Sequence, residues 1–290
     1  MRIVVTGVSG LIGSAFATEL GIQGHEVIGV SRSPSAGSVG WEQVTATLMN
    51  DVDAVVNLAG ETIAGRWTSQ KKRRITRSRL EAAESVSNAI RDSDRPPSVL
   101  IQASASGYYG SRGNEVLDER SSPGSGFLAD LCREWEATAE TVRTVNTRLV
   151  LARFSVVLAA EGGALAPLKT LTSVGLGGPL GRGRQWWSWI SLHDTVRSLF
   201  HLLETDISGP VNVSSETPVQ QRDFSKTLSK VLRRPCLVPT PEIALKAVLG
   251  EMGQTLLLDS TRLRPSVLTT SGFKFEEGDL ESALRRIFNT

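Results

Sequence analysis

The 290-residue sequence is poor in the residues that build metal centres, disulfide frameworks and membrane spans. It has two cysteines, too few for a disulfide scaffold, and neither lies in a metal-binding motif. Its three histidines are too far apart for a zinc-protease spacing. No apolar run approaches the roughly 18 residues of a membrane-spanning helix. We therefore expect no bound metal and no membrane partner.

The sequence also has no marked excess of positive or negative charge, because its formal net charge is only +2. A basic run at 71–74 is the local exception, and we interpret it as a solvated helix face rather than a nucleic-acid site. The chain enters an apolar segment at once, without a charged leader, so a cytoplasmic location is the default expectation. We expect a small-molecule substrate and no nucleic acid as partner, and leave a homodimer open.

What the sequence does contain is a glycine pattern at its N-terminus, where an apolar run at 3–5 is followed by glycines spaced three apart and then by a helical pattern. In this context the first glycine permits a tight turn, the second lets the backbone approach a pyrophosphate, and the third lets helix and strand pack closely. The helix N-terminus adds free N–H groups and a positive dipole end. We predict a dinucleotide site here, the alternative being an ordinary glycine-rich turn. The residues assigned to it are Gly7, Ser9, Gly10, Leu11, Ile12 and Gly13.

Farther along the chain, apolar strand segments alternate with helical patterns. This alternation predicts an α/β fold with a doubly wound, parallel sheet of Rossmann type. Right-handed crossovers bring the carboxyl ends of the strands to one edge, where ligands collect. Strands are expected at 26–30, at 54–58, from 99 and over 149–158, and helices over 76–91, 127–142 and 192–204. Residues expected at the ligand edge are Gly7, Arg32, Gly60, Ser104 and Phe154.

The alternation fails between 162 and 190, a span rich in glycine, proline and tryptophan. We assign residues 1–160 and a returning helix at 192–205 to a dinucleotide-binding domain. Residues 161–191 and 212–290 are assigned to a smaller C-terminal lobe on the substrate side. The tryptophans at 186, 187 and 189 either wall a substrate pocket or pack between the lobes, and both interpretations stay open.

The end of the second expected strand predicts which dinucleotide is bound. NAD sites carry an acid there that bonds the ribose 2′-hydroxyl. Here the strand ends in Ser31 and Arg32, and no acid follows before Glu42. Arginine presents a planar fork of donors that suits a phosphate, which favours NADP(H), unless Arg32 is a solvent-facing loop cation.

Several motifs resemble those of an atypical, epimerase-like family of extended short-chain dehydrogenases/reductases. They are TGVSGLIG at 6–13, NLAGE at 57–61, SASGYYG at 104–110, GLGGPLGRGRQWWSWI at 175–190 and GPVNV at 209–213. The resemblance covers essentially the whole chain. It implies that Leu58, Ala59 and Gly60 line the cofactor. Arg79 either reaches a phosphate or lies on the surface.

The same resemblance implies a catalytic Tyr-x-x-x-Lys pair with a nearby Ser or Thr, and here this chain departs from the pattern. Its two tyrosines are Tyr108 and Tyr109, and neither has a lysine four residues later. In the helix that should carry the pair, the positions hold either Gly126 and Asp130 or Leu128 and Cys132. Tyr109 matches the tyrosine that follows the fifth strand in extended reductases, and we assign the proton donor to it. Ser104 is assigned to the site beside it.

Two functional hypotheses follow. In the first, the protein is an NADP(H)-dependent oxidoreductase or epimerase that acts on an unidentified carbonyl or hydroxyl substrate, with Tyr109, Tyr108 or a water held by Ser104 as donor. In the second, it is an NADP(H)-binding sensor or regulatory protein with little or no catalysis. The missing pair separates them, because hydride transfer depends mainly on positioning and is slowed rather than abolished without the usual acid.

Overall fold

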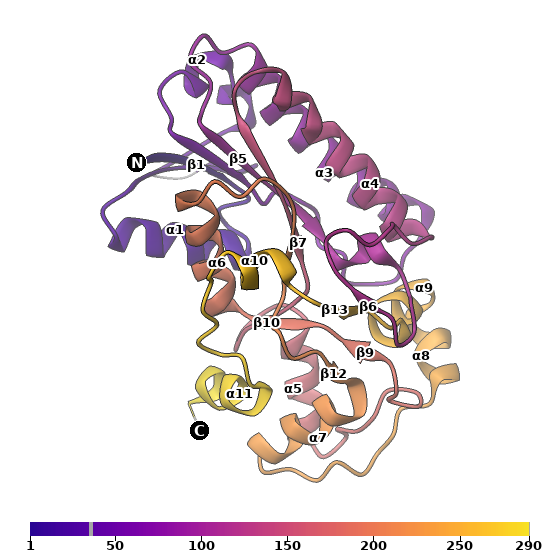
Figure 1. Ribbon diagram of the computed structural model, residues 1–290. Coiled ribbons are helices and arrows are strands. Elements are labelled where there is room, and N and C mark those ends of the chain that lie inside the picture. The colour runs from indigo at the N-terminus through magenta and orange to yellow at the C-terminus, as the bar shows by residue number, and fades with distance from the viewer. Residues whose placement is uncertain (35–36, 290) are drawn as a thin grey trace.

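A seven-stranded, fully parallel sheet forms the upper part of the computed structural model, which describes residues 1–34 and 37–289 (Figure 1). The spatial order of its strands is β11-β7-β5-β4-β1-β2-β3, so the order reverses direction at β1, as in doubly wound folds. The strands are β1 (Arg2–Thr6), β2 (Glu26–Val30), β3 (Ser38–Val39), β4 (Ala54–Asn57), β5 (Val99–Ala105), β7 (Arg148–Phe154) and β11 (Gly209–Val213).

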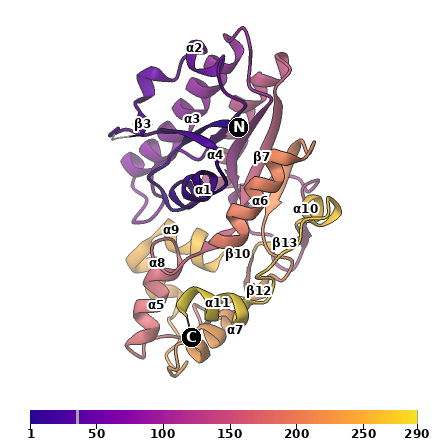
Figure 2. The same cartoon turned by 90° about the vertical axis from the view of Figure 1, so that its left-hand side faces the viewer.

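Helices cover both faces of this sheet, as Figure 2 shows from the side. The expected α/β fold is therefore confirmed. Among the described residues, no helix combines the length and the apolarity that a membrane crossing requires. The helices of this part are α1 (Leu11–Ile22) and α6 (Leu192–Glu204) on one face, and α3 (Ser69–Arg91) and α4 (Phe127–Glu140) on the other, with the short α2 (Ala46–Met49) near β4.

The apolar runs of the strands are continuous because alternate side chains enter two different cores. From β1, Ile3 and Val5 pack in one core with Phe16 of α1. Val4 enters the opposite core, where it packs with Ile90 of α3. All of these side chains are fully buried, so the two cores hold the sheet from both sides.

The first helix boundary to differ from expectation is that of α3, which begins at Ser69 rather than near 76. Thr68 is its N-cap, and its hydroxyl oxygen accepts the N–H of Lys71 at 3.1 Å. The basic run at 71–74 therefore lies in the first turns of this helix, in agreement with its interpretation as a helix face.

The strand expected over 149–158 is broken at Ser155, whose N–H and hydroxyl both donate to the carbonyl oxygen of Val213. After this break, β8 (Val156–Leu158) leaves the large sheet and pairs with β10 (Trp189–Ser191). The break redirects the chain from the sheet into the lobe.

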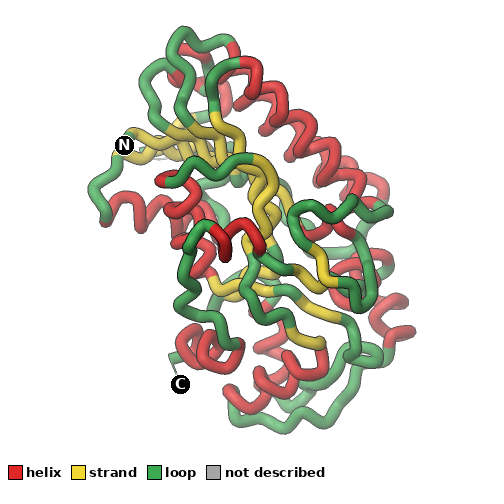
Figure 3. Tube along the Cα trace, in the orientation of Figure 1, coloured by secondary structure: helices red, strands yellow, loops and turns green. Residues whose placement is uncertain are grey.

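The C-terminal lobe lies below the large sheet in Figure 3. Residues that follow β5 and β7 share a cavity with residues of the lobe, so the lobe lies at the carboxyl ends of these strands. Its core is built around Trp187, Trp189 and Phe224. Because β11 belongs to the large sheet, the lobe boundary expected at 212 falls inside a strand and has to move beyond Val213. The elements of the lobe and its contacts are α5 (Leu165–Ser173), β9 (Trp186–Trp187), β12 (Val219–Gln220), α7 (Gln221–Val231), α8 (Glu242–Leu249), α9 (Glu251–Gly253), β13 (Arg262–Leu263) paired with β6 (Val116–Leu117), α10 (Ser266–Thr270) and α11 (Leu280–Phe288).

A buried polar network fastens β5, β7, α4 and β11 together. Arg153 of β7, only 3% exposed, forms a bidentate pair with Glu136 of α4, with Nε–Oε1 and Nη2–Oε2 distances of 2.8 Å. The Ser104 hydroxyl donates to Glu136 Oε1 at 2.6 Å. Arg153 Nη1 also donates to the Tyr109 hydroxyl at 3.0 Å, which in turn donates to Asn212 Oδ1 at 2.7 Å. A buried charge needs such partners, because an unpaired one is strongly destabilising.

We expect Tyr109→Phe to lower the free energy of unfolding by about 1–3 kcal/mol, the usual penalty for leaving buried groups unpaired. The substitution keeps the ring but deprives Arg153 and Asn212 of one partner each. Urea denaturation measures the effect.

The matched control is Tyr108→Phe. The Arg153 guanidinium carbon lies 3.5 Å from the centroid of the Tyr108 ring. The Tyr108 hydroxyl makes no hydrogen bond within the described part of the chain. We expect this variant to change stability by less than about 0.5 kcal/mol, as surface substitutions do. Equal effects of the two variants would contradict the assignment of the Tyr109 hydroxyl to the network.

Candidate functional site

The turn between β1 and α1 requires glycine at two positions. Gly7 has a φ of +66°, and a Cβ there would lie 2.8 Å from the carbonyl oxygen of Leu58 in the loop after β4. A Cβ on Gly13 would overlap the Gly7 carbonyl oxygen. Gly10 is the N-cap residue of α1 in an extended conformation and offers no side-chain cap. The first N–H groups of α1 thus keep their capacity to bind an anion.

A cavity of about 860 Å³ opens beside this turn, at the carboxyl ends of β1, β2 and β4. We call it the glycine-turn cavity. Its volume is within the range of small-molecule and cofactor sites. Of the predicted cofactor residues, it brings together Gly7, Ser9, Gly10, Ser31, Arg32, Leu58, Ala59 and Gly60.

Charged side chains from α3 complete the rim of the glycine-turn cavity, and sequence reasoning missed them. Arg74 and Arg77 line it together with Arg32. Glu61 lies among these cations, 2.9 Å from Lys71 Nζ and 3.8 Å from Arg32 Nη1. The hydrogen bond and charge of Lys71, with the neighbouring arginines, hold the pKa of Glu61 below its usual value. Arg32 itself is 82% exposed, so it is free to exchange Glu61 for another anion.

Two predicted cofactor residues are placed elsewhere by the structure. Arg79 Nη1 donates to the carbonyl oxygens of Glu61 and Ile75, at 2.9 and 3.2 Å, so it fastens the loop after β4 to α3 instead of facing a phosphate. Burial lowers the pKa of this guanidinium. Phe154, at the end of β7, is 8% exposed and packs in the main core. Neither side chain lines the glycine-turn cavity, and both assignments need correction. Leu11, Ile12 and Gly13 form the first turn of α1, next to the cavity.

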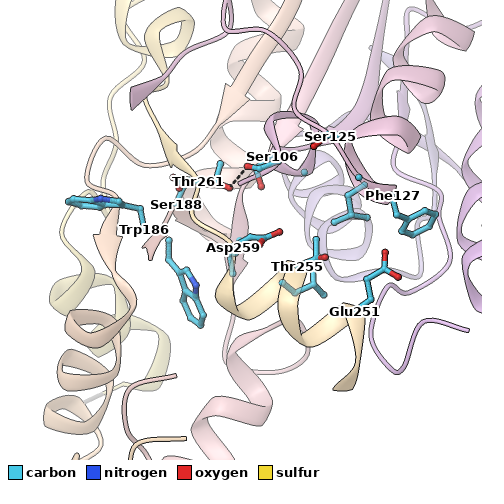
Figure 4. A pocket seen from close by; sticks show the side chains of 17 residues that line it. Ser106, Ser125, Phe127, Trp186, Ser188, Glu251, Thr255, Asp259 and Thr261 are labelled. Carbon is cyan, nitrogen blue, oxygen red and sulfur yellow. Dashed lines mark hydrogen bonds between the residues drawn. The ribbon is translucent and has the colours of Figure 1, made fainter. Parts of the chain in front are cut away.

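A second cavity, of about 240 Å³, lies between the large sheet and the lobe (Figure 4). We call it the interlobe cavity. The segment after β5 contributes Ser106 and Gly107 to its wall, and Val156 comes from the segment after β7. The opposite wall comes from the lobe, with Asp259 and Thr255 in Figure 4. Both cavities therefore lie along the same carboxyl edge of the sheet.

The tryptophan cluster divides between the two roles left open by the sequence. Trp189 is fully buried in the lobe core, and its Nε1 donates to the carbonyl oxygen of Thr217 at 2.9 Å. Trp186 lines the interlobe cavity, and its Nε1 donates to Asn114 Oδ1 at 3.0 Å. Trp187 does both, because it lines the cavity and packs on Phe224.

The predicted catalytic residues Tyr109 and Ser104 do not line either cavity. Tyr109 is fully buried, and burial raises the pKa of its hydroxyl to about 12. Ser104 is 2% exposed and bonded to Glu136. Both hydroxyls belong to the buried network, so their assignment as substrate-contacting groups needs correction. The physical reason is that the carboxylate and guanidinium of that network attract them inward.

The positions expected to hold the Tyr-x-x-x-Lys pair carry no acid–base group in the cavity. Leu128 lines the interlobe cavity at the start of α4. Cys132 is buried beneath it, with Sγ 3.8 Å from the carbonyl oxygen of Ala105, and burial raises the pKa of its thiol to about 11.

Two carboxylates of the interlobe cavity escaped sequence reasoning. Glu251 pairs with Lys72 of α3 at 2.5 Å. Asp259 accepts a hydrogen bond from Gln254 Nε2 at 3.0 Å, and burial raises the pKa of its carboxyl. No motif marks either residue, because both reach the sheet edge only through the packing of the lobe.

Comparison with known proteins places this geometry in a family. The model of the NAD dependent epimerase/dehydratase family matches residues 3–214, and that of a domain of unknown function, DUF1731, matches residues 240–287. Epimerase family protein Mb2239 of Mycobacterium bovis is 40% identical over 290 residues, covering 97% of this chain and 96% of the relative.

Two solved structures are similar over nearly the whole chain. Human epimerase family protein SDR39U1, solved with NADPH, has a TM-score of 0.95 at 32% identity and full coverage of both chains. A nucleoside-diphosphate sugar epimerase from Corynebacterium glutamicum has a TM-score of 0.80 at 30% identity, covering 98% of this chain and 57% of that one. The glycine turn, the sheet and the lobe together show that this chain belongs to the NAD dependent epimerase/dehydratase family and ends in a domain of the DUF1731 type.

Proposed function

We propose that this chain binds NADP(H) along the carboxyl edge of its sheet and uses it as an oxidoreductase or epimerase on a carbonyl or hydroxyl group in the interlobe cavity. The observation that carries the proposal is the position of the two cavities on one edge. The glycine-turn cavity lies at the carboxyl ends of β1, β2 and β4, and the interlobe cavity lies at the carboxyl ends of β5 and β7. Ligands of open α/β sheets bind at this edge, where a dinucleotide extends from one site toward the other.

The residues of the glycine-turn cavity fit the cofactor. Gly7 and Gly13 leave no room for side chains, so backbone N–H groups face the place where a pyrophosphate would bind. Ser31 and Arg32 would hold the 2′-phosphate, which displaces Glu61 from Arg32. NADPH in the similar human structure supports this choice of dinucleotide.

In the interlobe cavity, the bound nicotinamide would supply or accept a hydride. The chain's own task is to position the substrate and to handle a proton. Tyr109 is not placed for that task, because its hydroxyl is held by Arg153 and Asn212. The Asp259 carboxyl faces the cavity, and burial raises its pKa toward the range of a general acid or base.

A second candidate function is that of an NADP(H)-binding sensor with little catalysis. It is favoured by one observation, that the positions expected to hold the catalytic pair carry either Gly126 and Asp130 or Leu128 and Cys132, and neither choice is a tyrosine–lysine pair. The two functions differ in whether the bound cofactor is consumed.

We expect the protein to oxidise NADPH slowly when supplied with a panel of aldehydes and ketones, followed by the absorbance of NADPH. Turnover should be slow because lysine, which would assist a proton donor, does not occur among the described residues that line the interlobe cavity. Tight binding of NADPH without consumption by any member of a broad panel would favour the sensor instead.

We expect Gly10→Asp to abolish NADPH binding while the protein stays folded. Aspartate is a good N-cap residue, so α1 tolerates it, but its carboxylate would oppose the pyrophosphate. Isothermal titration with NADPH measures the loss. Gly21→Asp, on the exposed far end of the same helix, is the matched control and should bind as the wild type does. Unchanged affinity in a folded Gly10→Asp variant would refute the site.

We expect Arg32→Ala to weaken NADPH binding by about 1.5–3 kcal/mol, the scale of a hydrogen bond to a charged group, and NADH binding much less. Arg95→Ala is the control, since Arg95 pairs with Asp51 and does not line the cavity. Equal losses for NADPH and NADH would show that Arg32 contacts a part that both cofactors share.

A further inference from the structure

We propose that the interlobe cavity selects a small, uncharged carbonyl or polyol compound and rejects nucleotide sugars and other anions. This inference rests on the proposed function, because it names the substrate class of the same site. It is carried by the charges, the volume and the wall of the cavity.

The ionisable groups among the described lining residues of the interlobe cavity are the carboxylates of Glu251 and Asp259. Lysine, arginine and histidine do not occur among those lining residues. A nucleoside diphosphate carries at least two negative charges on its phosphates, and proteins hold such groups with arginine, lysine or clustered N–H groups. The ionisable groups of the wall are thus negatively charged, as the phosphates of this class of substrate are, and would repel them.

Two cations that contact side chains of the wall are already engaged. Lys72 Nζ lies 2.5 Å from Glu251 and 4.9 Å from the centroid of the Phe127 ring. The Arg262 guanidinium lies 4.1 Å from the centroid of the Trp186 ring. Lys72 therefore balances the charge of Glu251 but does not pair with Asp259.

The positive charge of Lys246, which pairs directly with Glu242, also acts on Asp259. Asp259 therefore carries a negative charge that is only partly compensated. Its partner is the neutral amide of Gln254, and it forms no ion pair with any described residue. The N-terminus of α4 also borders the cavity at Phe127 and Leu128, and it contributes about half a positive charge. A full carboxylate outweighs that half charge, so the cavity stays electronegative.

The volume of the cavity also favours small compounds. Its volume of about 240 Å³ lies below the range of roughly 300–1,000 Å³ that is typical of sites for drug-sized ligands. A nucleotide sugar is larger than that, whereas a single ring or a short polyol fits.

The chemistry of the wall indicates what the cavity accepts. Aromatic rings of Phe127, Trp186 and Trp187 offer apolar faces to a flat or ring-shaped molecule. Hydroxyls of Ser106 and Thr255 offer hydrogen bonds without charge. Rings and hydroxyls together suit an aromatic carbonyl or a neutral sugar.

The test compares two probes that differ in one charge, benzaldehyde and 4-carboxybenzaldehyde, on the NADPH-saturated protein. Saturation-transfer NMR measures the dissociation constant of each, with UDP-glucose as a third probe. We expect the neutral aldehyde to bind at least about tenfold more tightly than the carboxylated one, a difference of about 1.4 kcal/mol. UDP-glucose should give no binding below 1 mM.

The variant Asp259→Asn should reduce the ratio of the two dissociation constants several-fold by weakening the repulsion of the anion. The matched control is Asp51→Asn, an exposed aspartate paired with Arg95 and outside the wall of the cavity, which should leave the ratio unchanged. Preference for the carboxylated aldehyde, a dissociation constant below 1 mM for UDP-glucose, an unchanged ratio in Asp259→Asn, or no binding of either aldehyde would each overturn the proposal.

Consumption of NADPH is recorded separately with the same probes, so the two proposals fail in different ways. If benzaldehyde binds with the expected preference but no carbonyl compound oxidises NADPH, the enzymatic function fails and the charge selection stands. If both aldehydes are reduced equally well, the charge selection fails and the enzymatic function stands.

Discussion

The buried pair of Arg153 and Glu136 is the interaction on which the ligand edge of this protein depends. It joins β7 to α4, and its hydrogen bonds reach Ser104 on β5 and Tyr109 in the turn that follows. Taking two charges out of water costs several kcal/mol per ion, and a single missing partner exposes that cost. The network is therefore stable only when all its members are in place, which locks four elements in one arrangement.

The segments that the network joins also contribute to the wall of the interlobe cavity. Ser106 and Gly107 follow Ser104 by a few residues, and Leu128 begins the helix that carries Glu136. The network thus anchors segments that line the cavity. The hydroxyls of Ser104 and Tyr109 are held within the network and do not line the cavity.

The break of the strand at Ser155 separates two parts of the molecule that contribute to different cavity walls. The large sheet provides the glycine turn and the backbone N–H groups for a cofactor. The lobe, which begins where β8 leaves the sheet, contributes Trp186 and Asp259 to the interlobe cavity. The two walls of this cavity therefore come from distant parts of the chain.

The sequence by itself determined the parts of this protein that depend on local patterns. Continuous apolar runs predict strands covered on both faces, and the alternation of strands with helices predicts the doubly wound sheet. Gly7 and Gly13 predict the turn because their conformational and steric requirement lies within one short segment. Most of the glycine-turn cavity follows from those patterns, since strand ends of a parallel sheet meet at one edge.

The tertiary structure alone decided what the polar side chains do. Tyr109, Ser104 and Arg79 stand near the expected positions in the chain, yet each turns toward a buried partner. Asp259 reaches the interlobe cavity from the lobe, and no sequence motif predicts this position. The physical reason is that the orientation of a polar group depends on which partner satisfies it. Such partners come from segments far away in the sequence, as Asn212 does for Tyr109.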